Sequence, residues 1–188
     1  MTRPAPSAAR RQRLVEAAER LFSRHGLRAV TMAAIAAEAG LAKATVYAYF
    51  ADKEEVFRAV AQALATSLVA AVEQGLAIQG STAVRIAAAL RAKDTLIYEL
   101  VTGSPHAGEL LEARDRLVRE LFEDTDRQIL KRITAALSDG VERGLPAARL
   151  ARILVRASRG LAARVERPDA MQRDIEFMVT RMIDCGRI

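Results

Sequence analysis

Residues 31–50 read TMAAIAAEAGLAKATVYAYF, a string with the layout of two short helices folded about one glycine. We expect an alanine-rich helix over residues 32–39, a turn at Gly40 and Leu41, and a second helix over residues 43–50. Gly40 suits the turn because glycine adopts a positive φ without a steric penalty. The string therefore predicts a helix-turn-helix unit.

An apolar seam should hold the two helices together and decide which face stays free. Four apolar side chains should form this seam: Ile35, Leu41, Val46 and Phe50. The other side chains of the second helix are short or polar, with one cation and three hydroxyls: Lys43, Ala44, Thr45, Tyr47, Ala48 and Tyr49. Such a set can enter the major groove, so we expect this face to bind DNA.

The stretch from Thr31 to Val56 resembles the DNA-binding signature of the tetracycline-repressor (TetR) family of transcriptional regulators. In that family a Gly-x-x-x-x-Thr-x-Tyr-x-x-Phe run is followed by a Lys that opens the next helix. The matching residues here are Gly40, Thr45, Tyr47, Phe50 and Lys53. The resemblance implies that the DNA-binding residues are Thr31, Lys43, Ala44, Thr45, Tyr47, Tyr49 and Lys53.

Two features depart from the family pattern. Ala42 stands where Ser or Thr usually caps the second helix, and the missing cap costs about 1 kcal/mol. Ala44 and Ala48 also leave few side chains for base contacts, so DNA shape should carry part of the specificity.

Positive charge concentrates at the end of the chain that holds this motif. Residues 1–50 carry eight Arg or Lys against three Glu, whereas residues 51–188 carry 21 Arg or Lys against 20 Asp or Glu. Phosphate binding requires such a field, although a solvated basic surface would give the same count. Lys53 fits the same interpretation: a cation at the first position of a helix opposes the helix dipole, so a phosphate partner explains it better.

The rest of the chain shows helical periodicity without the alternating pattern of strands, so we expect an all-α fold of about nine helices. A DNA-binding domain should occupy residues 1–52, and a ligand-binding and dimerisation domain residues 53–188. The remaining expected helices cover residues 10–25, 53–77, 83–101, a short stretch ending at 113, 114–141, 147–165 and 170–185.

The larger domain is poor in aromatic residues, because five of the eight lie in the first 57 positions. A pocket there would be lined mainly by aliphatic side chains and would suit a small hydrophobic effector, although most of these residues must form the core. Candidate ligand contacts are Tyr98, His106, Phe122 and Arg127. His106 fits the surface of a first helical turn equally well.

The last two expected helices each carry an apolar stripe. The first stripe comprises Leu150, Ile153, Leu154, Ala157 and Leu161; the second comprises Ile175, Met178, Val179, Met182 and Ile183. The resemblance implies a four-helix interface between two copies of the chain. The alternative is that both stripes face the monomer's own core.

Catalytic and metal chemistry find little support in the sequence. One cysteine and two distant histidines provide no zinc spacing, so we expect neither a metal nor another cofactor. His106 with Glu109, or Tyr98 with Glu99, could form an acid–base pair, but no activated nucleophile or phosphate-binding glycine loop accompanies them.

The sequence therefore favours a cytoplasmic bacterial regulator, without a membrane-spanning segment, that binds operator DNA as a homodimer. We expect a repressor that a hydrophobic effector releases from a palindromic site. A DNA-organising protein that senses no ligand is the alternative, and an all-α enzyme is the less favoured one.

Overall fold

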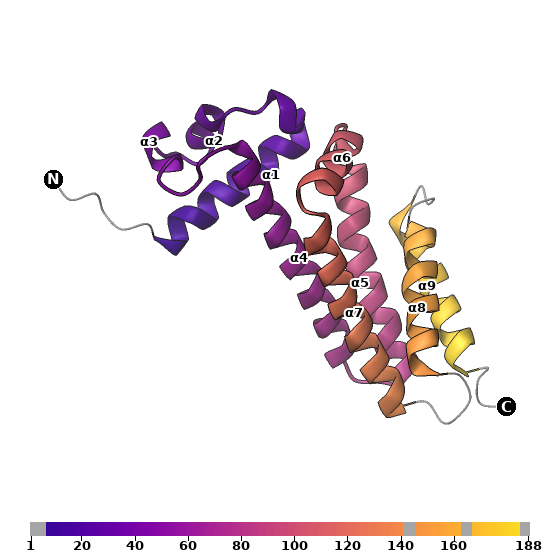
Figure 1. Ribbon diagram of the computed structural model, residues 1–188. Helices are drawn as coiled ribbons and strands as arrows, with labels where there is room; N and C mark the ends of the chain where they lie inside the picture. Colours follow the sequence, from indigo (N-terminus) through magenta and orange to yellow (C-terminus); the bar gives the residue numbers. More distant parts are fainter. Residues whose placement is uncertain (1–6, 141–145, 163–166, 185–188) are drawn as a thin grey trace. The chain divides into compact units, whose positions relative to one another are not determined.

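The computed structural model describes residues 7–140, 146–162 and 167–184, and every regular element in these ranges is a helix. The all-α prediction is therefore confirmed for the described part of the chain. The helices follow in this order (Figure 1): α1 (Ala8–Ala29), α2 (Met32–Glu38), α3 (Lys43–Val46), α4 (Lys53–Ala77), α5 (Thr82–Thr102), α6 (Ala107–Leu117), α7 (Arg119–Gly140), α8 (Ala147–Ala162) and α9 (Pro168–Asp184).

The helices gather into two compact units, and the chain enters each of them more than once. The first unit holds the described residues up to Leu64 together with Thr102–Leu121. The second holds Ala65–Val101 and the described residues from Phe122 onward. Helix α6 therefore belongs to the unit that contains the helix-turn-helix. The expected boundary between residues 52 and 53 separates a DNA-binding part from a ligand-binding part. It remains a prediction, because the division into compact units does not test what each part binds.

The core of the first unit forms where the apolar side of α1 meets α2, α3 and the start of α4. The ring centroids of Phe22 in α1 and Phe57 in α4 are 6.0 Å apart, and the rings are tilted by 57°. Other side chains of this core are at most 2% exposed: Leu14, Ala18, Ile35, Val46, Phe50 and Val56. Burial of each large apolar side chain contributes about 1.5–3 kcal/mol, so this seam holds the helix-turn-helix against α1.

Helix α1 departs from helical geometry at Gly26, the residue that follows the helix expected over residues 10–25. Gly26 has a φ of +75°, and a short helical stretch then continues to Ala29. A side chain at Gly26 would be strained, and its Cβ would collide with the Glu109 carboxylate of α6. The positive φ is therefore the main reason for a glycine here, because the Glu109 carboxylate is the flexible end of a side chain.

The second helix of the motif is shorter than expected. It ends at Val46 rather than at Phe50. The N–H groups of Ala48 and Tyr49 donate to the carbonyls three residues earlier, at 3.0 and 2.9 Å, which is the tighter pattern of a final helical turn.

A second boundary also differs from the prediction. Helix α6 continues to Leu117, and the long helix expected from residue 114 begins only at Arg119. Val118 separates them with a φ of −142° and a ψ of 25°, and its side chain is buried. Because no glycine or proline marks this break, local sequence signals could not locate it.

Helix α4 covers the predicted range and begins with reciprocal capping bonds. The Asp52 carboxylate accepts the Glu55 N–H at 2.8 Å, and the Glu55 carboxylate accepts the Ala51 N–H at 2.5 Å. The helix is long and apolar enough to cross a membrane by length and composition alone. Val56 and Val72 on this helix are 0% exposed, so part of its apolar surface packs inside the protein.

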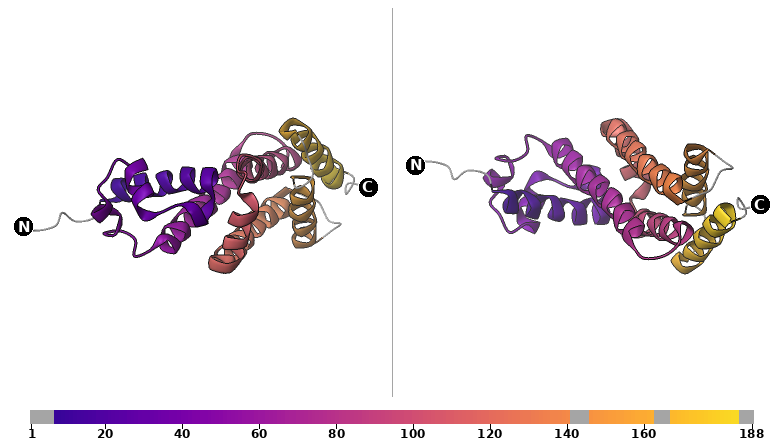
Figure 2. Two further views of the ribbon diagram at one scale, coloured as in Figure 1. Left: turned by 90° about the horizontal axis from the view of Figure 1, so that it is seen from above. Right: turned by 90° about the horizontal axis from the view of Figure 1, so that it is seen from below.

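The second unit contains the later part of α4 with α5, most of α7, α8 and α9. Helices α8 and α9 contact each other, and Figure 2 shows them as the orange and yellow pair. Their inward side chains are fully or almost fully buried: Leu150, Leu154, Met171, Ile175 and Val179. Helices α4 and α5 approach closely at Gly75, where an added Cβ would lie 2.8 Å from the Ala88 carbonyl carbon and would overlap the Ala89 backbone.

We predict that Gly75→Ala destabilises the protein by about 1–3 kcal/mol, because its methyl group would push the α5 backbone away. Gly108→Ala is the matched control. An added Cβ at Gly108 meets no described atom within 4 Å outside its own helical turn, and alanine favours a helix by about 0.5–1 kcal/mol. Thermal unfolding of both variants provides the measurement. Equal stability of Gly75→Ala and the parent protein would contradict the close crossing.

Candidate DNA-binding surface

Helices α2 and α3 form the helix-turn-helix around Gly40. The Thr31 hydroxyl accepts the Ala34 N–H at 3.1 Å and caps α2. Gly40 adopts a φ of +62°, and the Leu41 N–H donates to the Ala36 carbonyl at 2.9 Å, which reverses the chain. Helix α3 receives no side-chain cap from its N-terminal residue, an alanine, as the sequence predicts.

One face of α3 is buried and the other is open. Val46 is 0% exposed and anchors the buried face. Lys43 and Ala44 are exposed, Thr45 is half-buried, and Tyr47 is 50% exposed. The structure therefore places the predicted base-reading and phosphate-binding side chains of α3 where a macromolecule can reach them.

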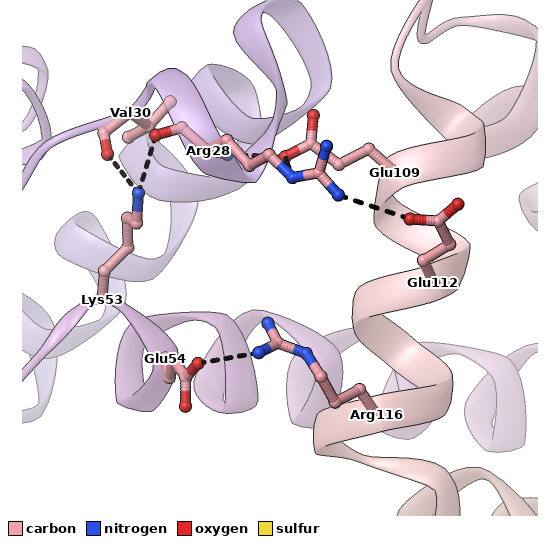
Figure 3. A network of polar contacts seen from close by, with 7 residues as sticks. All are labelled: Arg28, Val30, Lys53, Glu54, Glu109, Glu112 and Arg116. Atoms are coloured by element: carbon pink, nitrogen blue, oxygen red, sulfur yellow. Dashed lines mark hydrogen bonds and ion pairs between the residues drawn. The ribbon is translucent and has the colours of Figure 1, made fainter.

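Besides Thr31, which caps α2, two more of the predicted DNA contacts have internal partners. The Tyr49 side chain is half-buried, and its hydroxyl accepts the Ser7 N–H at 2.8 Å, which ties the start of α1 to the motif. The Lys53 ammonium donates to the carbonyls of Arg28 at 3.0 Å and Val30 at 2.8 Å (Figure 3). These carbonyls explain a cation at the start of α4 without a phosphate, although an ammonium has three donors and keeps one for another partner.

Arginines of α1 also act within the unit. The Arg13 guanidinium donates to the Ala39 carbonyl, at the end of α2, at 2.7 Å. The Arg20 guanidinium donates to the Glu38 carboxylate at 2.8 Å and lowers the pKa of that carboxyl. Part of the positive charge counted near the motif is therefore used to join α1 to α2.

Polar contacts dock α6 on the end of α1 and the start of α4 (Figure 3). The Glu109 carboxylate accepts the Arg28 N–H at 2.6 Å, and the Arg28 guanidinium lies 3.5 Å from the Glu112 carboxylate. The Arg116 guanidinium lies 3.5 Å from the Glu54 carboxylate of α4. Sequence reasoning missed these contacts because the residues are up to 81 positions apart and share no motif.

The four predicted effector contacts divide between the two units. His106 directly precedes α6 and belongs to the first unit. Tyr98 on α5 and Phe122 on α7 are half-buried in the second unit. Arg127 is also on α7, but its side chain is 65% exposed and paired with Asp124. Their common membership of one effector site remains a prediction.

Sequence reasoning also missed a charged pair in the core of the second unit. Lys93 and Asp94 on α5 are 3% and 1% exposed and form an ion pair with each other. Among the described residues, nothing donates a hydrogen bond to Asp94 Oδ2. An unsatisfied buried acceptor lowers the stability of the fold by about 1–3 kcal/mol. Helical spacing could have indicated that Asp94 is buried, because Asp94 follows Leu90 by four residues and Ile86 by eight on the buried side of α5.

The residues predicted for a dimer interface divide between core and surface. Five are buried within the monomer: Leu150, Leu154, Ile175, Val179 and Ile183. Ile153 is 39% exposed, and the other four are half-buried: Ala157, Leu161, Met178 and Met182. Phe177 lies outside both predicted stripes and is 65% exposed. Part of each predicted stripe is therefore buried in the monomer, and the rest of it, together with Phe177, remains at the surface of α8 and α9.

Comparison with known proteins identifies the motif. The family model described as bacterial regulatory proteins, tetR family, matches residues 14–60, from α1 into α4. A nicotine-responsive transcriptional repressor of the helix-turn-helix type, HdnoR of Paenarthrobacter nicotinovorans, is 29% identical over 143 residues, which are 68% of this chain and 69% of the relative.

Solved structures share the fold along almost the whole chain. A TetR-family regulator from Mesorhizobium loti superposes with a TM-score of 0.75 at 19% identity, covering 97% of this chain and 98% of the other. The SmeT–triclosan complex superposes with a TM-score of 0.67 at 23% identity, covering 93% of this chain and 91% of the other. Residues 14–60 therefore carry the DNA-binding region of the TetR family of bacterial regulatory proteins, and the chain is similar in sequence and fold to transcriptional regulators of that family.

Proposed function

We propose that the protein is a homodimeric repressor that binds palindromic operator DNA and releases it when a small hydrophobic molecule binds the second unit. The observation that carries the proposal is the open face of α3, with Lys43, Ala44 and Tyr47 exposed in the helix-turn-helix of a regulator family. HdnoR responds to nicotine and SmeT forms a complex with triclosan, which supports a small-molecule effector here as well.

Helix α3 enters the major groove in this proposal. Lys43 and Thr45 read base edges, and the small Ala44 side chain allows close approach and can contact a thymine methyl group. Tyr47, with the remaining donor of the Lys53 ammonium and the exposed Thr31 region, binds phosphate oxygens and sets the register. Because so few side chains read bases, DNA shape supplies the rest of the specificity.

The exposed surface of α8 and α9 forms the dimer interface in this proposal. A groove of about 410 Å³ lies between the two helices, lined by Ala157, Gly160, Leu161, Asp174, Phe177 and Met178. Outside its own helical turn, no described atom lies within 4 Å of a Cβ added at Gly160, which leaves space for a side chain of a second copy. In a twofold pair the same contact occurs twice, so Phe177 of each copy can enter the groove of the other.

Control of DNA binding passes along the chain through α4 and α6. Helix α4 runs from the first unit into the second, and α6 is linked through α5 and α7 to the second unit while it contacts α1. An effector that shifts either helix changes the separation of the two α3 helices, which a palindrome requires to be about 34–36 Å. A coupling of about 1–3 kcal/mol gives a 5–150-fold change in affinity, and DNA must weaken the effector by the same factor.

We predict that Tyr47→Phe weakens binding by a similar factor on operator and unrelated DNA, because it removes a proposed phosphate contact. Lys43→Ala should instead change the sequence preference, because Lys43 reads a base. The operator can be selected from random-sequence DNA, and fluorescence anisotropy at several salt concentrations gives the affinities.

Lys53→Ala should lower the magnitude of the log–log salt slope by about 1 if its ammonium also binds a phosphate. It should destabilise the fold as well, because the Arg28 and Val30 carbonyls lose their donor. Lys131→Ala, an exposed lysine of α7, is the control for net charge and should leave the slope unchanged. An unchanged slope in both variants would assign Lys53 to the fold alone.

We predict that Phe177→Glu converts the dimer into a monomer, because it places a charge in the α8–α9 groove. Val84→Glu is the control, since Val84 is 47% exposed on α5, outside this surface. Light scattering at micromolar concentration distinguishes the two states. A dimeric Phe177→Glu protein would show that the interface lies elsewhere.

The docking of α6 gives a further prediction. Glu109→Ala should destabilise the first unit by about 1.5–3 kcal/mol, because a charged acceptor of the Arg28 N–H is lost. Glu112→Ala should change stability by no more than about 1 kcal/mol, because its side chain is 74% exposed in its pair with Arg28. Denaturant unfolding of both variants tests this difference, and similar losses would contradict the special role of Glu109.

A further inference from the structure

The buried Lys93–Asp94 pair is the most unusual feature of the second unit. The surrounding positions of α5 are apolar and almost completely buried: Ile86, Ala87, Ala89 and Leu90. Removing two charges from water is unfavourable even when they pair, and an apolar pair of similar size often folds at least as stably. Fold stability therefore does not account for this pair.

The pair is also incompletely satisfied. Lys93 donates to Asp94 Oδ1, while Oδ2 is buried and accepts no hydrogen bond from the described residues. Buried polar atoms are nearly always satisfied, so each exception requires an explanation. A buried acceptor without a partner is what a binding site provides when one polar group orients a mostly apolar molecule.

Polar side chains continue beside the pair on α5. The Thr95 hydroxyl accepts the Gln172 amide of α9 at 3.3 Å, and the Arg91 guanidinium donates to Glu176 at 3.0 Å. Thr95 and Arg91 therefore already have partners on α9, whereas Asp94 Oδ2 has none among the described residues. The free acceptor is therefore the point at which a bound molecule would gain most from a hydrogen bond.

We propose that Asp94 Oδ2 is the polar anchor of the effector site and takes the O–H or N–H donor of an uncharged, mainly aliphatic molecule. This inference rests on the proposed function. Lys93 already neutralises Asp94, so the pair adds no net charge that would attract a cation into the core. A carboxylate would place a second anion beside Oδ2 and has no donor to offer. A neutral alcohol or amide satisfies the free acceptor without adding charge.

The test compares molecules that differ only in the donor. Hexanol, octanol and decanol are titrated calorimetrically into the full-length protein beside their methyl ethers, which keep the oxygen but lose the O–H group. We expect the alcohol with the best-fitting chain to bind about tenfold or more tighter than its ether, since the ether leaves Oδ2 unsatisfied. Octanoate and octylammonium should bind more weakly than octanol. Equal binding of alcohol and ether, or no binding by any of the alcohols, would overturn the proposal.

A double variant assigns the preference to the pair. Lys93→Met with Asp94→Leu removes both charges at similar volume and should fold, dimerise and bind DNA like the parent, but its alcohol-to-ether ratio should fall to about one. Arg91→Gln, which removes an exposed cation of the same helix, should keep the parent ratio. A double variant that retains the preference would exclude Asp94 as the anchor. If the double variant fails to fold, the alcohol–ether comparison on the parent still decides whether a donor is required.

Operator binding is measured separately and without any added alcohol. If the parent protein binds no operator, the proposed function is overturned. If it binds an operator but shows no preference for the alcohol over the ether, only the inference about Asp94 is overturned.

Discussion

The backbone polar groups at the end of α1 must find partners, and the organisation of the first unit depends on how they do so. After Gly26 leaves the helical conformation, the Arg28 N–H is accepted by Glu109 of α6, and the carbonyls of Arg28 and Val30 are taken by Lys53 of α4. A buried or half-buried peptide group without a partner would cost as much as a lost hydrogen bond. One short segment therefore joins α1, α4 and α6.

This arrangement gives α6 a double character. It is encoded between two helices of the second unit, yet it packs with α1 through Glu109 and the glycine that makes room for its carboxylate. A shift of α6 would disturb Arg28 and, through its carbonyl, the Lys53 ammonium at the start of α4. The contacts that stabilise the helix-turn-helix are thus the same contacts through which a distant event could reach it.

The two units use charge in opposite ways. In the first unit, arginines that a simple count would assign to DNA serve the fold: Arg11 lies over the Phe50 ring at 5.2 Å, and Arg13 caps α2. The open face of α3 then carries little more than Lys43 and Tyr47. In the second unit, the informative residues break the expected pattern, with Asp94 buried and Phe177 exposed. Each of these two departures supports a separate proposal about binding.

Local chemistry made much of this molecule readable from its residues. Gly40 predicts the turn, the Asp52 and Glu55 capping pair predicts the start of α4, and helical periodicity predicts the all-α class, because these signals act within a few positions of the chain. The break at Val118, the docking of Glu109 on Arg28 and the internal partners of Tyr49 and Lys53 could not be predicted in this way. These features depend on which distant segments of the chain meet. The exposed side of α8 and α9 also depends on tertiary packing, since an apolar stripe packs equally well against its own core or against a second copy. Only the packing of helices distant in the chain decides between these arrangements, because it determines which polar atoms are removed from water and which apolar side chains remain exposed to water.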